Sequence, residues 1–175
     1  MSENILEKII KKKKLELEIN KISNSIESFL NVIENNNHKN IYINFKEKIE
    51  QNIKENKISI ISEIKQASPS AGIIIENYDP VEIAKVYNKK KVTCLSVLTE
   101  QDYFKGKIYD VAKIKLANIK LPILCKDFFI DKWQVPFAKA NGADAILIIL
   151  AGVSDDLADE LYEEALRFNM SVIVE

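Results

Sequence analysis

The chain has 175 residues, of which 47% are hydrophobic and 29% are charged. This balance suits one globular domain with an ordinary core and argues against intrinsic disorder. The net charge is near −1, so the whole chain has no electrostatic attraction to nucleic acid or to an anionic membrane. No apolar run approaches the roughly 18 residues that a membrane helix needs. We therefore expect neither a nucleic-acid partner nor a membrane partner.

The two cysteines, Cys94 and Cys125, stand far apart, and neither belongs to a CxxC or CxxH pattern. The sequence therefore predicts no disulfide framework and no metal site. Its N-terminus lacks the basic-then-apolar layout of a secretory signal. Together these features predict a reduced, cytoplasmic protein.

Residues 1–57 contain neither Gly nor Pro and are predicted to be helical. An apolar stripe begins at Ile5 and continues to Leu17, and the run Lys11–Lys14 that interrupts it is expected to be a solvated helix face. Apolar residues at 45, 49 and 53 predict a second amphipathic helix. The stretch 35–40, which contains the single histidine, His38, is expected to be a polar surface loop.

From residue 58 onward, short β-branched runs alternate with amphipathic segments. The runs predict five strands, at 58–65, 92–99, 121–128, 143–150 and 170–175. The segments between them predict helices at 80–90, 107–117, 132–141 and 155–168, with Asp79, Asp131 and Ser154 as N-caps. This alternation is typical of a parallel sheet covered by helices.

Two α/β architectures fit such a pattern, the doubly wound open sheet and the TIM-barrel type (β/α)8 fold. The first strand-to-helix connection has neither GxGxxG nor GxxxxGK[ST], which disfavours the nucleotide-binding open sheets. Polar residues at the strand ends (Glu63, Lys65, Lys126 and Glu175) favour a barrel, whose strand C-termini surround one mouth. A complete barrel takes about 200 to 250 residues. We therefore expect a barrel truncated after strand 5, in residues 58–175, preceded by the helices of residues 1–57.

Several residues at the predicted mouth suit chemistry, and each also has a structural interpretation. Glu63 and Lys65 lie on one face of their strand and form either part of a site or a salt bridge that caps the barrel. Lys126 is expected to point inward, as a general acid or a Schiff-base nucleophile, whereas Cys125 is expected to be a core residue. Phe104 either lines a site or pins its loop. The turn Ser68-Pro69-Ser70 offers hydroxyls and amides to an anionic oxygen.

The chain contains five sequence blocks, which in order are ISEIKQASPSAG (61–72), SVLTE leading to YFKG (96–106), KDF with Asp131 and Gln134 (126–134), GADAILII (142–149) and Val174-Glu175. Together they resemble the indole-3-glycerol phosphate synthase family, whose members are (β/α)8 enzymes of tryptophan biosynthesis. The match runs along the whole chain and includes an N-terminal ILEKI-type helix, which implies that residues 1–57 form a helical extension over the barrel mouth. Several ordered blocks at consistent spacing are far more specific than one short motif.

The resemblance implies ring closure of 1-(2-carboxyphenylamino)-1-deoxyribulose 5-phosphate, a small phosphorylated substrate, with loss of carbon dioxide and water and without a cofactor. It implies that Lys126 is the general acid, that Lys65 holds the anionic groups, that Glu175 assists loss of water and that Glu63 orients the lysines. It further implies substrate contacts, with an anthranilate slot made of Phe104, Phe128, Leu147 and Ile149, and with Ser68 and Pro69 beside the phosphate.

The chain also departs from the family pattern. The family usually has a Gly-Ala pair before its second strand, where this chain has Lys89-Lys90-Lys91-Val92. Strands 6 to 8, with the family's phosphate-binding loops, do not follow strand 5, and an open five-strand sheet exposes two edges. We expect this chain alone to fold incompletely or to need a complementing chain or oligomer, and to be inactive.

Two alternatives remain at this stage. One is another sugar-phosphate barrel enzyme, such as phosphoribosylanthranilate isomerase or a Schiff-base aldolase, against which the block E-x-K-x-x-S-P-S argues. The other is a non-catalytic half-barrel that serves as an assembly partner.

Overall fold

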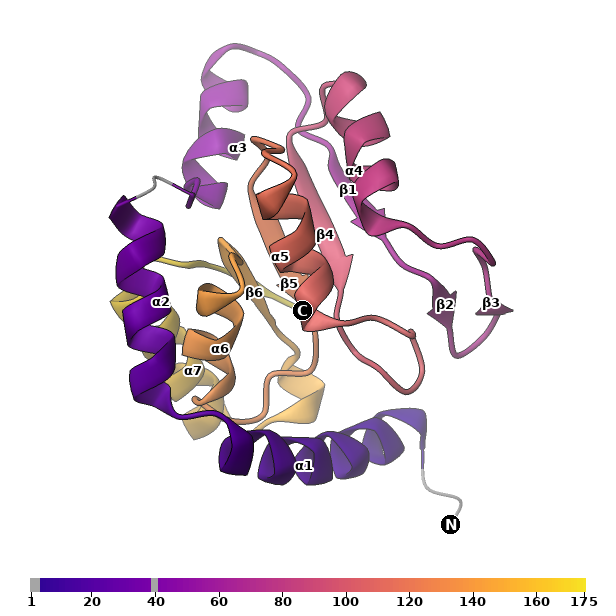
Figure 1. Ribbon diagram of the computed structural model, residues 1–175, viewed down its shortest axis with the longest axis vertical. Helices are drawn as coiled ribbons and strands as arrows, with labels where there is room; N and C mark the ends of the chain where they lie inside the picture. The colour runs from indigo at the N-terminus through magenta and orange to yellow at the C-terminus, as the bar shows by residue number, and fades with distance from the viewer. Residues whose placement is uncertain (1–3, 39–40) are drawn as a thin grey trace.

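The computed structural model describes residues 4–38 and 41–175. Its centre is a sheet of five parallel strands in the order β1-β4-β5-β6-β7, so that strands that follow each other in this series are also neighbours (Figure 1). The strands are β1 (Ile61–Ile64), β4 (Cys94–Leu98), β5 (Ile123–Lys126), β6 (Ala145–Ile148) and β7 (Ser171–Val174). The prediction of a parallel α/β sheet is confirmed.

Four helices cover one face of this sheet and bury the larger core. They are α4 (Pro80–Lys89), α5 (Ile108–Leu116), α6 (Gln134–Ala140) and α7 (Asp155–Arg167). Alternation along each strand sends successive side chains to opposite faces. Cys125 accordingly packs in the core beneath the helices, while Leu124 packs on the other face with Cys94, Ala145 and Leu147. The predicted core position of Cys125 is confirmed.

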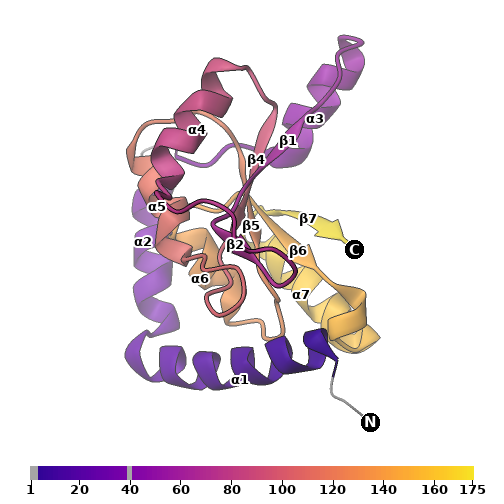
Figure 2. The same cartoon turned by 90° about the vertical axis from the view of Figure 1, so that its right-hand side faces the viewer.

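The three helices that the structure describes within residues 1–57 lie in three different places (Figures 1 and 2). Helix α1 (Ile5–Ser23) crosses the carboxyl ends of the strands and contacts the 3₁₀ turn η1 (Leu150–Gly152) that follows β6. Helix α2 (Ile26–His38) packs on α6 through Phe29, Trp133 and Phe137. Of the three, α1 is therefore the helix that lies over the mouth.

Helix α3 (Phe45–Lys54) lies at the opposite end, where the strands begin. Its Phe45 is 1% exposed and packs on the sheet face that carries Leu124. The Lys46 amide donates to Ser171 at the start of β7, and Asn52 donates to Thr93 just before β4. The predicted stripe at 45, 49 and 53 thus forms a helix that closes the amino end of the sheet.

Several boundaries differ from the predictions. Helix α2 continues to His38, so the polar loop expected at 35–40 is wrong for its first part, while Lys39 and Asn40 and the side chain of His38 lie outside the described residues. Helix α6 begins at Gln134, because the Gln134 side chain accepts hydrogen bonds from two preceding amides and holds a turn there. Asp131 is thus not its N-cap, whereas Asp79 and Ser154 cap α4 and α7 as predicted.

A short hairpin, β2 (Ala67–Ser68) and β3 (Gly72–Ile73), follows β1 and was not predicted. Within it, Ser68 Oγ accepts the Ala71 amide at 3.2 Å, which confirms the tight polar turn. Elsewhere, no helix among the described residues has the length and apolar character to span a bilayer.

Candidate active site

Eight of the ten candidate site residues line one open cleft of about 260 Å³ at the carboxyl ends of the strands. Leu98 and Asp127 complete its lining. The eight come from the ends of four strands and from the loop after β4: Glu63, Lys65, Phe104, Lys126, Phe128, Leu147, Ile149 and Glu175. The convergence expected from the barrel pattern is therefore observed, although these side chains come from segments that are far apart in the sequence.

Glu63 holds both lysines of the cleft. Its carboxylate lies 2.6 Å from Lys65 Nζ through Oε1 and 2.9 Å from Lys126 Nζ through Oε2. All three side chains are about one-third exposed, so they can reach a bound molecule while still paired. The arrangement fits both earlier interpretations of Glu63, because the salt bridge lies inside a cleft.

The two ammonium groups control the protonation of Glu63. Burial by itself raises the pKa of this carboxyl, but the hydrogen bonds from Lys65 and Lys126 and their charges outweigh burial, so its pKa lies below the ordinary value. Glu63 is consequently an anion at neutral pH. Two ammonium donors fixed around one carboxylate can protonate an oxygen and hold an anionic group in the same cleft.

Glu175 reaches the cleft from the end of β7. Its amide donates to Ile148 O at 2.9 Å and its carbonyl oxygen accepts the Leu150 amide at 2.9 Å, so the backbone that carries it is fixed to β6. The side chain itself is exposed. This places a carboxylate on the opposite side of the lining from β1, with room for a molecule to contact it.

The aromatic wall depends on the loop after β4. The buried Glu100 carboxylate accepts the amides of Asp102, Tyr103 and Phe104 at 2.8 to 3.0 Å. Gly106 then returns the chain against β4, where a Cβ atom would lie only 2.2 Å from Leu98 O. These contacts fix the loop so that the Phe104 side chain lines the cleft.

Ser68 and Pro69 are not among the lining residues of this cleft. They lie in the β2–β3 hairpin at the same end of the sheet, and the Ser68 hydroxyl is engaged within its own turn. The hairpin is nonetheless tied to the cleft loop, because the Ala67 amide donates to Phe104 O at 3.2 Å.

Lys13 is the residue that the sequence reasoning missed. The run Lys11–Lys14 was expected to be solvated, but Lys13 is 2% exposed and its ammonium lies 2.9 Å from Asp127. The signal was present in the spacing, since Ile9, Lys13 and Leu17 recur every four residues and all three are buried. A lysine on the buried stripe of a helix needs an anionic partner.

Cys125 does not line the cleft. Burial raises the pKa of Cys125 to about 12, which confirms that this thiol is a core residue rather than a nucleophile. Within residues 4–38 and 41–175, no group of three or more His, Cys, Asp or Glu side chains is placed to hold a metal ion.

Comparison with known proteins agrees with the ordered blocks. The family model described as indole-3-glycerol phosphate synthase matches residues 6–175. This chain belongs to the indole-3-glycerol phosphate synthase family. Among the family's curated members, the one from a Thermoanaerobacter species is 42% identical over 171 residues, which is 98% of this chain and 62% of that protein.

Two further relatives carry the same name. The one from Polynucleobacter asymbioticus is 40% identical over 174 residues, covering 98% of this chain and 65% of that protein. The chloroplastic one from Arabidopsis thaliana is 45% identical over 116 residues, covering 66% of this chain and 29% of that protein. The matches to these family members thus span less than two thirds of the relatives' own lengths.

Proposed function

We propose that the cleft catalyses the reaction of the family, the conversion of 1-(2-carboxyphenylamino)-1-deoxyribulose 5-phosphate into indole-3-glycerol phosphate, carbon dioxide and water. The observation that carries this proposal is the Glu63 carboxylate between Lys65 and Lys126 in an apolar-walled cleft. Family membership identifies the substrate. The charged side chains of the cleft suit its carbonyl and anionic groups, and the apolar side chains suit its aromatic ring.

Lys126 is the general acid in this proposal. As the aromatic ring carbon attacks the ribulose carbonyl carbon, the Lys126 ammonium protonates the carbonyl oxygen, and loss of carbon dioxide returns an electron pair to the ring. Lys65 holds the substrate's anionic groups, and Glu63 keeps both ammonium groups oriented. In the dehydration step Lys65 protonates the new hydroxyl group, which leaves as water, and Glu175 accepts the proton that the substrate nitrogen loses as the double bond forms.

The remaining candidates bind the substrate. Phe104, Phe128, Leu147 and Ile149 supply the apolar part of the cleft lining and would hold the flat anthranilate ring. Ser68 and Pro69 are proposed as neighbours of the phosphate, supported by their turn at the same end of the sheet rather than by contact with the cleft.

We propose that the five strands are part of a (β/α)8 barrel that further strands close, and that the chain alone is inactive. One support is the sheet order, which leaves β1 and β7 as the two edges of the sheet. The other is that the matched segments cover only 62% and 65% of two relatives' own lengths. We also propose residues 1–57 as the helical extension, residues 58–175 as the barrel part, and a cytoplasmic location consistent with two buried thiols.

A chimera tests the activity. This chain is joined to the part of the Polynucleobacter asymbioticus relative that the alignment leaves uncovered, and indole fluorescence is followed after substrate is added. We expect turnover in the chimera, a loss of about 10² to 10⁴-fold in Lys126→Met, and an unchanged rate in Lys132→Met, an exposed lysine paired with Glu160. A folded chimera without turnover would refute the function. Turnover by the 175-residue chain alone at the rate of a full-length relative would refute the need for further strands.

A further inference from the structure

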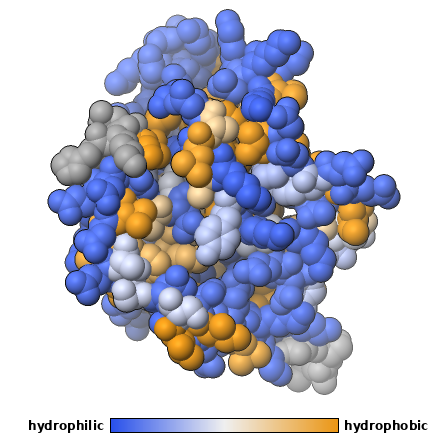
Figure 3. Space-filling view, in the orientation of Figure 1, coloured by the Kyte–Doolittle hydropathy of each residue, from blue (hydrophilic) through white to orange (hydrophobic). Residues whose placement is uncertain are grey.

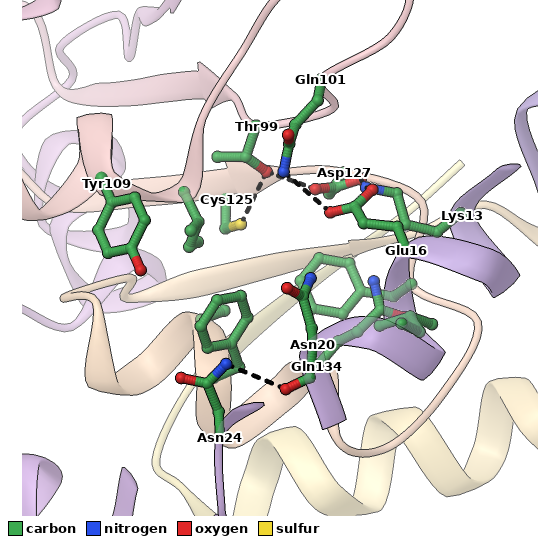
Figure 4. Close-up of a pocket in the computed structure, with 15 residues that line it drawn as sticks. Lys13, Glu16, Asn20, Asn24, Thr99, Gln101, Tyr109, Cys125, Asp127 and Gln134 are labelled. Atoms are coloured by element: carbon green, nitrogen blue, oxygen red, sulfur yellow. Dashed lines mark hydrogen bonds and ion pairs between the residues drawn. The ribbon is translucent and has the colours of Figure 1, made fainter. Parts of the chain in front are cut away.

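Asp127 separates the cleft from a second, smaller cavity beneath α1. This cavity of about 80 Å³ is lined mostly by polar side chains, including Lys13, Glu16 and Thr99, and Asp127 is the one described residue that lines both spaces (Figure 4). Asp127 also directly follows Lys126 in the chain. Whatever fixes Asp127 therefore acts next to the proposed general acid.

The Asp127 carboxylate is held from three directions. Lys13 Nζ lies 2.9 Å from Oδ1, the Thr99 hydroxyl donates to Oδ2 at 2.7 Å, and the Phe128 amide donates to Oδ1 at 2.8 Å. Figure 4 shows Lys13 and Glu16 reaching from α1 toward this group. Of these three donors, Lys13 alone carries a charge.

The charges around Asp127 are unevenly distributed. Lys13 and Glu16 face it from α1, 2.8 Å apart. Glu100, just after β4, is close enough to Glu16 to raise the pKa of that carboxyl, and Lys126 precedes Asp127 on β5. Burial lowers the pKa of Lys13, but Asp127 and Glu16 outweigh burial and raise it above the ordinary value. Lys13 is thus a permanent cation at neutral pH, although almost no solvent reaches it.

We propose that Lys13 is a positioning residue for Lys126. Its ammonium neutralises the Asp127 carboxylate, so that Glu63 remains the carboxylate partner of Lys126 in the cleft. Because Lys13 belongs to α1, the environment of Lys126 is complete only when this helix is docked across the ends of the strands. This inference rests on the proposed role of Lys126.

The physical consequence is specific. Without Lys13, Asp127 becomes a largely buried anion that lacks a cationic partner, and it lines the same cleft as Lys126. A nearby anion makes an ammonium group hold its proton more tightly, which lowers its reactivity as an amine and weakens it as an acid. If the role of Lys13 were purely structural, its removal would lower the stability of the fold and leave the reactivity of Lys126 unchanged.

Competitive labelling of amines by acetic anhydride, read by peptide mass spectrometry on the 175-residue chain, measures this without any turnover. We expect Lys13→Met to slow the labelling of Lys126 at mildly alkaline pH by about three- to tenfold. Lys13→Arg, which keeps the charge, should stay close to wild type. The matched control is Lys14→Met, an exposed neighbour on the same helix, which should change nothing at Lys126.

A charge cycle completes the test. Asp127→Asn should speed the labelling of Lys126, and the double variant Lys13→Met with Asp127→Asn should return it toward wild type. The proposal is overturned if Lys126 in the Lys13→Met variant is labelled at the wild-type rate. If that variant does not fold, the proposal is overturned when Asp127→Asn leaves the labelling rate of Lys126 unchanged. In the chimera, Lys13→Met should lower kcat, leave KM nearly unchanged and move the alkaline limb of the pH profile upward. A folded chimera without turnover would refute the proposed function. The labelling rate of Lys126 would still test the role of Lys13, because that measurement needs no turnover.

Discussion

Lys91 occupies a backbone conformation that suits glycine. It follows α4 with φ 59°, and its amide donates to Asn88 O at 3.0 Å to end the helix. A residue with a Cβ atom is strained by about 1 kcal/mol in this left-handed region.

We expect Lys91→Gly to stabilise the chain by roughly 0.5 to 1 kcal/mol, since relief of the strain exceeds the entropy that glycine adds to the unfolded chain. Urea unfolding measures the change. The control is Lys90→Gly, where φ is −80° and glycine brings no relief. Equal effects at both positions would contradict the strain at Lys91.

At the same scale, the low pKa of Glu63 makes a pH-dependent contribution to stability. The folded-state pKa lies below the ordinary 4.5, so the stabilisation is present at neutral pH and is lost as pH falls through the lowered value. Glu63→Gln should therefore cost about 1 kcal/mol at pH 7, a modest figure because the group is partly exposed, and less at pH 3 than at pH 7. Urea unfolding at both pH values checks this, and Glu82→Gln, in an exposed pair with Lys85, should show a much smaller difference.

At the scale of elements, a buried ion pair joins three parts of the fold at the amino end of the sheet. Asp144, just before β6, lies 2.6 Å from Lys115 of α5 and accepts the amides of Ile43, before α3, and Ile123, in β5. Both charged side chains are at most 5% exposed. The pair therefore fixes the segment that leads into α3 to the amino end of the sheet.

Lys115→Met should destabilise the chain by about 3 to 5 kcal/mol, because it leaves a buried carboxylate without its cation. The double variant with Asp144→Asn should lose less than the sum of the two single variants. Lys120→Met, an exposed lysine on the next segment, should stay within about 0.5 kcal/mol. Thermal and urea unfolding measure all of these, and an equal loss in Lys115→Met and Lys120→Met would exclude the anchoring role.

At the scale of the molecule, the sheet has two edges, β1 and β7, and apolar side chains at both are exposed, including Ile61 at 42% and Val174 at 55%. Other apolar surface occurs away from the edges, on α1 among them, and Figure 3 shows it as patches among polar side chains. Unpaired edges of this kind pair readily with other chains.

The 175-residue chain should consequently self-associate as its concentration rises. Val174→Lys should reduce this association, because a charge at an edge strand opposes pairing. Light scattering after size exclusion measures the change in mass. The control is Val86→Lys, a change of the same kind at a residue that is 56% exposed on α4; if it reduced the association equally, the β7 edge would not be responsible.

Much of the fold followed from local patterns. Strand and helix periodicities identified all five parallel strands and the four helices that cover them, because burial on one face imposes a period on the sequence. The strand ends also predicted that Glu63, Lys65, Lys126 and Glu175 would meet, since parallel strands bring their carboxyl ends together. The same reasoning missed the β2–β3 hairpin, whose strands of two residues each are too short to show a period.

What the sequence by itself determined is the five parallel strands, the four helices that cover them and the strand ends at which charged residues gather, because each of these depends on neighbours a few residues apart. Only the tertiary structure decided that α1 and α3 lie at opposite ends, that Ser68 and Pro69 stand outside the cleft, and that Lys13 is buried against Asp127. Those facts depend on contacts between residues more than a hundred positions apart in the case of Lys13, and no period in the chain encodes which distant carboxylate a buried lysine will meet.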